Sequence, residues 1–168
     1  MTQEEKDLLF KELTSRFPYG VKILEGNVII ETLERIEKVS ETDYVVNRVG
    51  DGTDGFGFEI SDVKLYLRPI SSMTEKEMDT LFDILKIDKR GDGESWIKIN
   101  DLLGIEFFIP EGVWVEDMIK AYDYLYSIHI DFRGLIGAGL ALKAPETMYT
   151  RFGDMKTVIG TIEHKDRL

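Results

Sequence analysis

The sequence predicts an α+β fold in which an N-terminal helix and an antiparallel sheet or small β-barrel precede a mainly helical second half. The hydrophobic period is helical at the start, changes to short β-branched segments with tight turns up to about residue 70, and becomes helical again in two later segments. A chain of 168 residues with 43% hydrophobic content can bury one sizeable core. We therefore expect a single domain over 1–168, with a helix and strand-rich lobe (1–70), a mainly helical lobe (71–149) and a C-terminal extension (150–168).

The first helix has clear signals at both ends. Thr2 can cap it, and Glu5 stands three residues later, as in a capping box. Pro18 forces the preceding residue out of helical geometry, so the helix should run from about Gln3 to Arg16. Its charged face is expected to be solvated. Its apolar face should hold Leu9, Phe10, Leu13 and Phe17.

Strands are expected next, and the Gly26-Asn27 turn predicts a hairpin that continues into residues 28–36. A helix is the alternative for Glu31 to Val39, because Ile29, Leu33 and Ile36 also fit that period. The β-branched content favours a strand. Three more strands are expected at Asp43 to Val49, Phe56 to Ile60 and Val63 to Leu67.

The second half should contain two amphipathic helices, over about Glu75 to Lys86 and Val115 to Ser127. The apolar face of the second is expected to face the core, and Tyr124 falls on its other side. That face comprises Val115, Met118, Ile119, Tyr122, Leu125 and Tyr126. Short extended segments are expected at 96–99, 105–109, 140–143 and 156–162.

Composition narrows the setting. The chain has no cysteine, which excludes disulfides, thiolate metal sites and cysteine nucleophiles and fits a reducing compartment. The N-terminus lacks the pattern of a signal peptide, and the longest apolar run, Gly134 to Leu142, is too short to cross a bilayer. We expect a cytoplasmic protein without membrane contact.

The formal charge of −11 is spread evenly, since residues 1–73 carry 9 basic and 14 acidic side chains and residues 74–168 carry 12 and 18. Nucleic-acid binding requires clustered Lys and Arg, so direct binding to nucleic acid is disfavoured. A protein partner that contacts an acidic surface remains compatible with this charge.

Two loops imitate known ligand motifs without their context. Residues 50–55 (GDGTDG) match the dinucleotide fingerprint, but a strand follows where that motif needs a helix. Residues 88–99 resemble a calcium loop, yet Arg90 and Ile99 occupy the third and twelfth positions, where ligands are needed. We interpret both as ordinary turns, and we expect neither a cofactor nor a metal ion. Magnesium bound by carboxylates alone stays open as an alternative, because 32 acidic residues make chance clusters common.

The best candidate for a binding site is the junction between the strands and the next helix, where Arg68, Ser71, Ser72 and Thr74 cluster. A helix N-terminus with hydroxyls and an arginine can bind an anion. Two capping boxes, Ser72 with Glu75 and Thr74 with Glu77, would use the same donors, and we favour capping.

A hydrolytic or small-ligand site could combine this junction with His129, Asp131 and Arg133. No Gly-x-Ser-x-Gly sequence supports a serine hydrolase, and the only other histidine, His164, has no metal-ligand spacing with a neighbour. We therefore assign no catalytic residue. The seven residues remain candidates for ligand binding only.

Two segments, residues 66–77 (YLRPISSMTEKE) and 131–149 (DFRGLIGAGLALKAPETMY), resemble a family of small uncharacterised proteins of gut bacteria and their prophages. Residues 18–22 (PYGVK) are similar to a segment of the same family. The resemblance spans most of residues 1–149 and implies a phage or mobile-element association, but it carries no activity or ligand.

The hypothesis that follows is a non-enzymatic, phage-associated binding protein that acts through protein-protein contacts. The small-ligand or hydrolytic site is the first alternative. A virion structural or assembly component is the second, and the sequence does not predict the oligomeric state.

Overall fold

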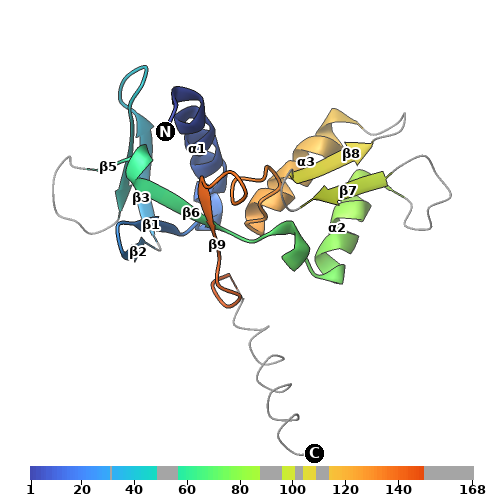
Figure 1. The fold of residues 1–168 in the computed structure, drawn as a ribbon. Coiled ribbons are helices and arrows are strands. Elements are labelled where there is room, and N and C mark those ends of the chain that lie inside the picture. The colour runs from blue at the N-terminus through green and yellow to red at the C-terminus, as the bar shows by residue number, and fades with distance from the viewer. Residues whose placement is uncertain (31, 49–56, 88–95, 101–103, 109–113, 150–168) are drawn as a thin grey trace, which may run out of the picture.

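The structure is a computed structural model that describes residues 1–30, 32–48, 57–87, 96–100, 104–108 and 114–149 (Figure 1), and for residues 48, 96–100 and 104–108 the backbone alone. The loops at 50–55 and 88–94 and the strand expected at 156–162 lie outside these ranges. The α+β class is confirmed by helices and largely antiparallel sheets in one chain.

The first helix, α1 (Gln3–Arg16), has the predicted bounds because both of its end signals operate. The Thr2 hydroxyl accepts a hydrogen bond from the Glu5 amide at 3.2 Å, and the Glu5 carboxylate accepts one from the Thr2 amide at 2.7 Å. After α1, a 3-10 turn, η1 (Phe17–Tyr19), contains Pro18 and ends at Gly20, whose φ of 71° suits a residue without a side chain.

A four-stranded sheet has the order β2-β1-β6-β9. Its strands are β1 (Ile23–Glu25), β2 (Val28–Ile30), β6 (Val63–Leu67) and β9 (Ala141–Lys143). The β1–β2 hairpin turns at Gly26, as predicted, and β1 also pairs antiparallel with β6. In contrast, β9 pairs parallel with β6, so the end of the described chain returns to its first half.

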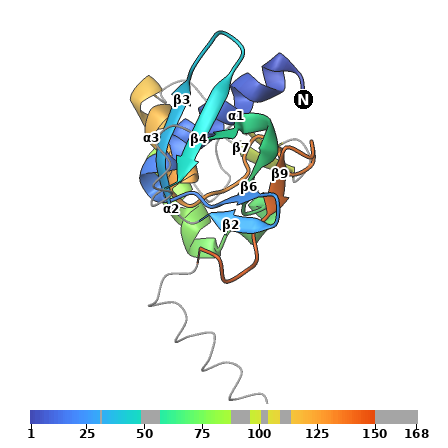
Figure 2. The same cartoon turned by 90° about the vertical axis from the view of Figure 1, so that its left-hand side faces the viewer.

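A second sheet, β3-β4-β5, is formed by β3 (Leu33–Lys38), β4 (Tyr44–Arg48) and β5 (Phe58–Glu59), and a 3-10 turn, η2 (Ile60–Asp62), leads into β6. For Glu31 to Val39, where a helix was the alternative, the strand prediction was correct, since β3 lies within this segment. The single strand expected over 28–36 was wrong, because β2 and β3 belong to different sheets. Figure 2 shows β3 and β4 crossing β2 at a steep angle, and no closed barrel forms in the described ranges.

The second half is mixed, so the expectation of a mainly helical lobe is not supported. It contains a 3-10 turn, η3 (Ile70–Ser72), the helices α2 (Glu75–Leu85) and α3 (Val115–Ser127), and the antiparallel pair β7 (Trp96–Asn100) and β8 (Gly104–Phe108). Figure 1 shows this hairpin beside α2 and α3.

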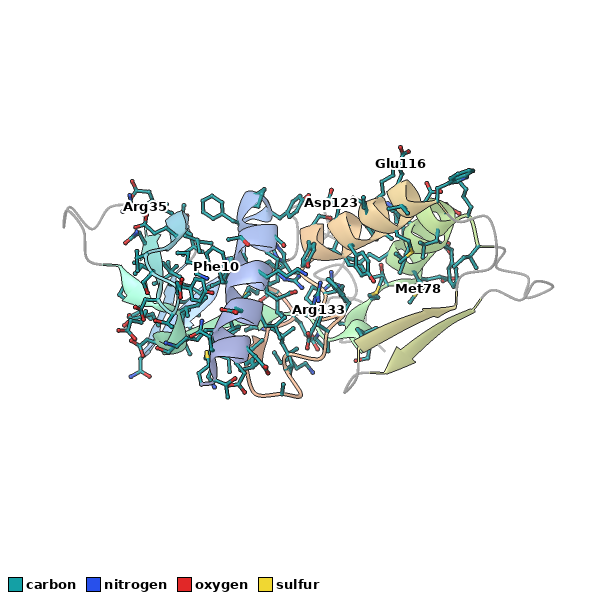
Figure 3. The ribbon with its side chains drawn as sticks, turned by 90° about the horizontal axis from the view of Figure 1, so that it is seen from above. Phe10, Arg35, Met78, Glu116, Asp123 and Arg133 are labelled. Carbon is teal, nitrogen blue, oxygen red and sulfur yellow. The ribbon has the colours of Figure 1, made fainter. Side chains whose placement is uncertain are left out.

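The buried apolar side chains form two clusters, and α1 lies between the β3-β4-β5 sheet and the helices of the second cluster (Figures 1 and 3). The first cluster contains Leu9, Leu13, Val21, Ile23, Ile30, Leu33, Tyr44, Val46, Ile60, Val63, Leu65, Leu67, Leu135 and Ala141. The second contains Ile70, Leu81, Leu85, Ile87, Ala121, Leu125, Tyr126, Ile130 and Phe132. The chain thus builds the second cluster between β6 and β9 of the first.

Candidate functional site

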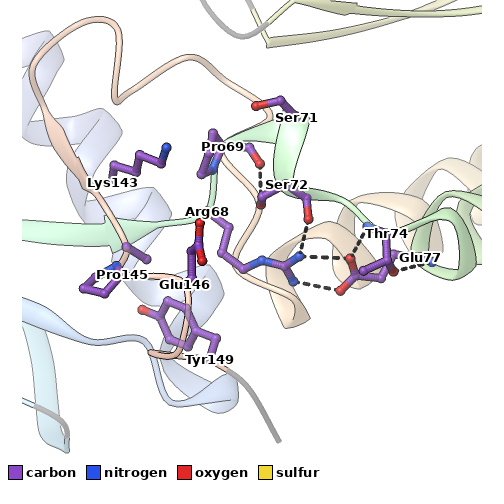
Figure 4. Close-up of a pocket in the computed structure, with 11 residues that line it drawn as sticks. Arg68, Pro69, Ser71, Ser72, Thr74, Glu77, Lys143, Pro145, Glu146 and Tyr149 are labelled. Carbon is purple, nitrogen blue, oxygen red and sulfur yellow. Dashed lines mark hydrogen bonds and ion pairs between the residues drawn. The ribbon is translucent and has the colours of Figure 1, made fainter. Parts of the chain in front are cut away.

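Arg68 joins the end of β6 to the start of α2. Its guanidinium donates to both carboxylate oxygens of Glu77, at 2.7 and 2.9 Å, and to the carbonyl oxygen of Ser72 at 2.9 Å (Figure 4). Both side chains of the ion pair are only 20% exposed. Arg68 is therefore bound within the fold, by the bidentate geometry that suits a guanidinium.

Thr74 caps α2 as predicted. Its hydroxyl accepts from the Glu77 amide at 3.2 Å, and the Glu77 carboxylate accepts from the Thr74 amide at 2.8 Å. Burial alone would raise the pKa of Glu77, but the hydrogen bonds from Arg68 and Thr74 outweigh it, and the pKa is lowered. The second predicted capping box is wrong, because the Ser72 hydroxyl donates to the Pro69 carbonyl at 2.7 Å and Thr74 is the cap.

A pocket of about 570 Å³ opens at this junction. Figure 4 shows that residues of the segment after β9 form one of its sides, with Tyr149 near Arg68. The lining carries both signs of charge together with the aliphatic hydroxyls of Ser71, Ser72 and Thr74. It comprises Arg68, Pro69, Ser71, Ser72, Thr74, Glu77, Lys143, Ala144, Pro145, Glu146 and Tyr149. The structure thus brings together four of the seven candidate residues.

The backbone of His129 is hydrogen-bonded to that of Arg68 at this junction, but the His129 side chain is buried, and the residue is only 4% exposed. Its Nε2 is 3.1 Å from the Tyr19 carbonyl, to which the neutral ring donates, and the ring stacks on Tyr149 at a centroid distance of 4.0 Å. Burial, and after it the positive charge of Arg16, lower the pKa of His129 to about 4. The imidazole is therefore neutral at pH 7 and is covered by Tyr149.

Asp131 is also used by the backbone. Its carboxylate accepts from the amides of Leu135 and Ile136, each at 2.8 Å, and thereby stabilises the turn that follows. The main chains of Arg68 and residues 129–131 do run side by side, through bonds of 2.9 Å from the Arg68 amide to the His129 carbonyl and 2.8 Å from the Asp131 amide to the Arg68 carbonyl. Their side chains bind separate partners.

Arg133 belongs to a different group, an ionic cluster with the buried residues Glu12, Arg16 and Tyr126, and its own side chain is 33% exposed. Glu12 and Arg16 are fully buried and joined at 2.9 Å, and Arg133 contacts the other carboxylate oxygen of Glu12 at 2.8 Å. Arg16 also donates to the Ile130 carbonyl at 2.9 Å, and its guanidinium carbon lies 4.9 Å from the centre of the Tyr126 ring. This cluster ties α1 to the second hydrophobic cluster.

The expectation that the charged face of α1 is wholly solvated was therefore wrong for Glu12 and Arg16. The helical period did indicate that Arg16 would be buried. Arg16 stands seven residues after Leu9 and three after Leu13, so it lies on the buried face of α1.

The outer side of α3 carries an apolar surface, which we call the α3 outer face and define as Trp114, Val115, Ile119 and Tyr122. These side chains are 71, 76, 62 and 36% exposed, respectively. The predicted core face of α3 was thus wrong for Val115, Ile119 and Tyr122.

The helix is instead rotated so that Asp117, Ala121 and Leu125 face inward. The buried Asp117 carboxylate accepts from the Lys86 ammonium at 2.8 Å, a hydrogen bond that lowers the pKa of Asp117 and links the end of α2 to α3. Tyr124, which the helical period places opposite the predicted core face, is partly buried and donates to the Glu77 carbonyl at 3.3 Å.

Among the described residues, no group of three or more His, Cys, Asp or Glu side chains is arranged to hold a metal ion. Within the same part of the chain, no helix has the length and apolar character needed to cross a membrane. Comparison of the chain with protein-family models, with curated proteins and with solved structures found no match.

Proposed function

We propose that the protein is a non-enzymatic binding protein that acts through contacts with another protein, and that the α3 outer face is the contact surface. The carrying observation is the exposure of Trp114, Val115, Ile119 and Tyr122 together on one side of one helix. Contiguous exposed apolar surface marks interaction sites, and large aromatic side chains are frequent at the centres of interfaces.

The polar candidates support the same choice. Arg68 is bound to Glu77, Asp131 stabilises a turn, and His129 is buried and neutral. Each of these groups has a structural partner. On the α3 outer face, Trp114, Val115 and Ile119 gain little of the burial that apolar side chains gain in a core, and Tyr122 packs on Phe132 at a centroid distance of 5.5 Å. The resemblance to small proteins of gut bacteria and their prophages adds a mobile-element-associated setting to the proposal, and the composition adds a cytoplasmic one.

Co-purification from the source cells tests the proposal with three forms of the full chain. The wild-type protein and a matched control, Val39→Asp, should retain the same protein partner, because Val39 is an exposed apolar residue between β3 and β4. Ile119→Asp should lose that partner. A wild-type protein that repeatedly purifies alone and elutes as a monomer would contradict the proposal, as would a partner that Ile119→Asp retains.

A small-ligand site is the second candidate function, and the pocket of about 570 Å³ at Arg68 favours it. Native mass spectrometry of freshly purified protein tests it. The expected result is a bound small molecule that is lost in Ser71→Ala with Lys143→Ala, two positions that both line the pocket. Protein that carries no added mass contradicts this function, and a defined homo-oligomer would favour an assembly component instead.

A further inference from the structure

We propose that the occupant of the α3 outer face is a basic amphipathic helix of a protein partner. This inference rests on the function proposed above and adds the chemistry of the partner. It follows from the spacing of the apolar residues and from the charges beside them.

The spacing suits a helix. Val115, Ile119 and Tyr122 stand at positions i, i+4 and i+7, so their side chains form a ridge about 10 Å long over two turns. Helix-binding surfaces use anchors with this repeat. A partner strand would require an unpaired sheet edge, whereas the backbone of α3 is hydrogen-bonded within the helix.

An acidic row borders the ridge. Glu116 and Asp123 also stand seven residues apart, and on an ideal helix they lie roughly 60° and 40° from Ile119. Figure 3 labels both at the outer edge of α3. Glu116 is exposed, and Asp123 keeps its carboxylate at the surface while it accepts a hydrogen bond of 2.5 Å from the Tyr19 hydroxyl.

The ion pairs of the two nearby lysines are with Asp117 rather than with this row. Lys86 and Lys120 both point to Asp117, at 2.8 and 3.9 Å, on the buried side of the helix. The partner is therefore expected to place Lys or Arg beside Glu116 and Asp123. The overall charge of −11 on this protein also attracts a positively charged partner.

The same charges disfavour a second copy of this chain as the occupant. In an antiparallel pair of α3 helices that cross at Ile119, Glu116 of each copy would lie beside Asp123 of the other. Like charges placed together across an interface oppose binding, and two copies that each carry −11 also repel at long range.

Fluorescence polarisation tests the proposal with the full-length protein. The probe is a fluorescein-labelled peptide of about 18 residues, with leucine at i, i+3, i+4 and i+7 and lysine on both flanks. The second probe has glutamate in place of lysine. The lysine peptide is expected to bind at least about tenfold more tightly than the glutamate peptide.

Two double variants separate the acidic row from general charge. Glu116→Lys with Asp123→Lys should raise the Kd of the lysine peptide by about tenfold or more. Glu4→Lys with Glu34→Lys changes the net charge equally at exposed positions outside α3 and should leave the Kd within about threefold. Ile119→Ser and Tyr122→Ser should each weaken binding, with circular dichroism to verify the fold.

Equal binding of the two peptides would overturn the inference, as would equal weakening by the two double variants. A wild-type dimer that Ile119→Asp dissociates would also overturn it, since the occupant would be a second copy, yet the proposed protein contact at α3 would stand. Failure of the proposed function has a separate sign, which is a natural partner that Ile119→Asp retains.

Discussion

The polar junction around Arg68 and the α3 outer face differ in how much of their chemistry the fold itself uses. The junction and its surroundings hold arginines, acids, hydroxyls and a histidine, and most of these groups bind one another or the backbone. The α3 outer face holds no charged group, but Trp114, Val115 and Ile119 in it are largely exposed to solvent. The better candidate for a binding surface is therefore the region whose side chains the fold leaves exposed, and not the region with the more reactive side chains.

The largest loss of stability is expected in the cluster of Glu12, Arg16 and Arg133, because its Glu12–Arg16 ion pair is fully buried. Glu12→Ala leaves Arg16 fully buried without its carboxylate partner and should lower the free energy of unfolding by about 3–5 kcal/mol. Urea denaturation measures this loss. The control Glu4→Ala, on the exposed side of the same helix, should change stability by less than about 0.5 kcal/mol. A small effect at Glu12 would mean that the cluster is not used structurally.

The next effect depends on pH through His129. Its pKa is about 4 in the folded chain and 6.5 as the ordinary value, so between these values the unfolded chain binds a proton that the folded chain does not. Stability should therefore fall as the pH drops from about 6.5 to 4, by about 3 kcal/mol in total for this group.

His129→Asn removes this titration, and asparagine tolerates the positive φ of 57° at this position. The measurement is the difference in unfolding free energy between the variant and the wild type at several pH values. A pH dependence that His129→Asn shares in full would contradict the buried neutral state.

A smaller effect is expected at the junction itself. Arg68→Met leaves Glu77 with its capping bonds but without the guanidinium, and should cost about 2 kcal/mol. Chemical denaturation compares it with Arg35→Met, which removes the exposed Arg35–Glu37 pair and should cost less than about 0.5 kcal/mol. Equal costs for the two variants would show that Arg68 is not needed by the fold and is available for a ligand.

The smallest effect is expected on the α3 outer face. Ile119→Ser should change the free energy of unfolding by less than about 0.5 kcal/mol, because the side chain is already in solvent. Leu125→Ala, a buried position on the inner side of the same helix, should cost about 2–5 kcal/mol. Thermal unfolding of both variants checks the contrast. If Ile119→Ser approaches the cost of Leu125→Ala, the face belongs to the core.

Much of the fold could be predicted because its signals are local. The Thr2 and Thr74 caps, Pro18 and the Gly26 turn act within a few residues, and they set the bounds of α1, α2 and the first hairpin. Strand partners were not predictable in the same way. The parallel pairing of β6 with β9 joins residues 76 positions apart, as Leu65 with Ala141 shows.

The candidate site was predicted less well, because the burial and the partners of its side chains depend on residues far away in the sequence. The period of α3 allows more than one apolar face, and the choice was decided by the packing of Ala121 and Leu125 and by the bond from Lys86 to Asp117. Likewise, nothing near Arg16 in sequence indicates that the carbonyl of Ile130 accepts its hydrogen bond. Residue spacing limits these alternatives, and tertiary contacts choose among them.

The parallel pair β6–β9 has a consequence for synthesis on the ribosome. The first hydrophobic cluster is missing Leu135 and the whole of β9 until the residues of the second cluster, up to Phe132, have been translated. The N-terminal lobe is thus translated first but completed last. Until β9 is translated, the edge of β6 that pairs with β9 has no strand partner. A chain released early would expose that edge to aggregation, so we expect slower translation through residues 70–141 to lower the yield of folded protein.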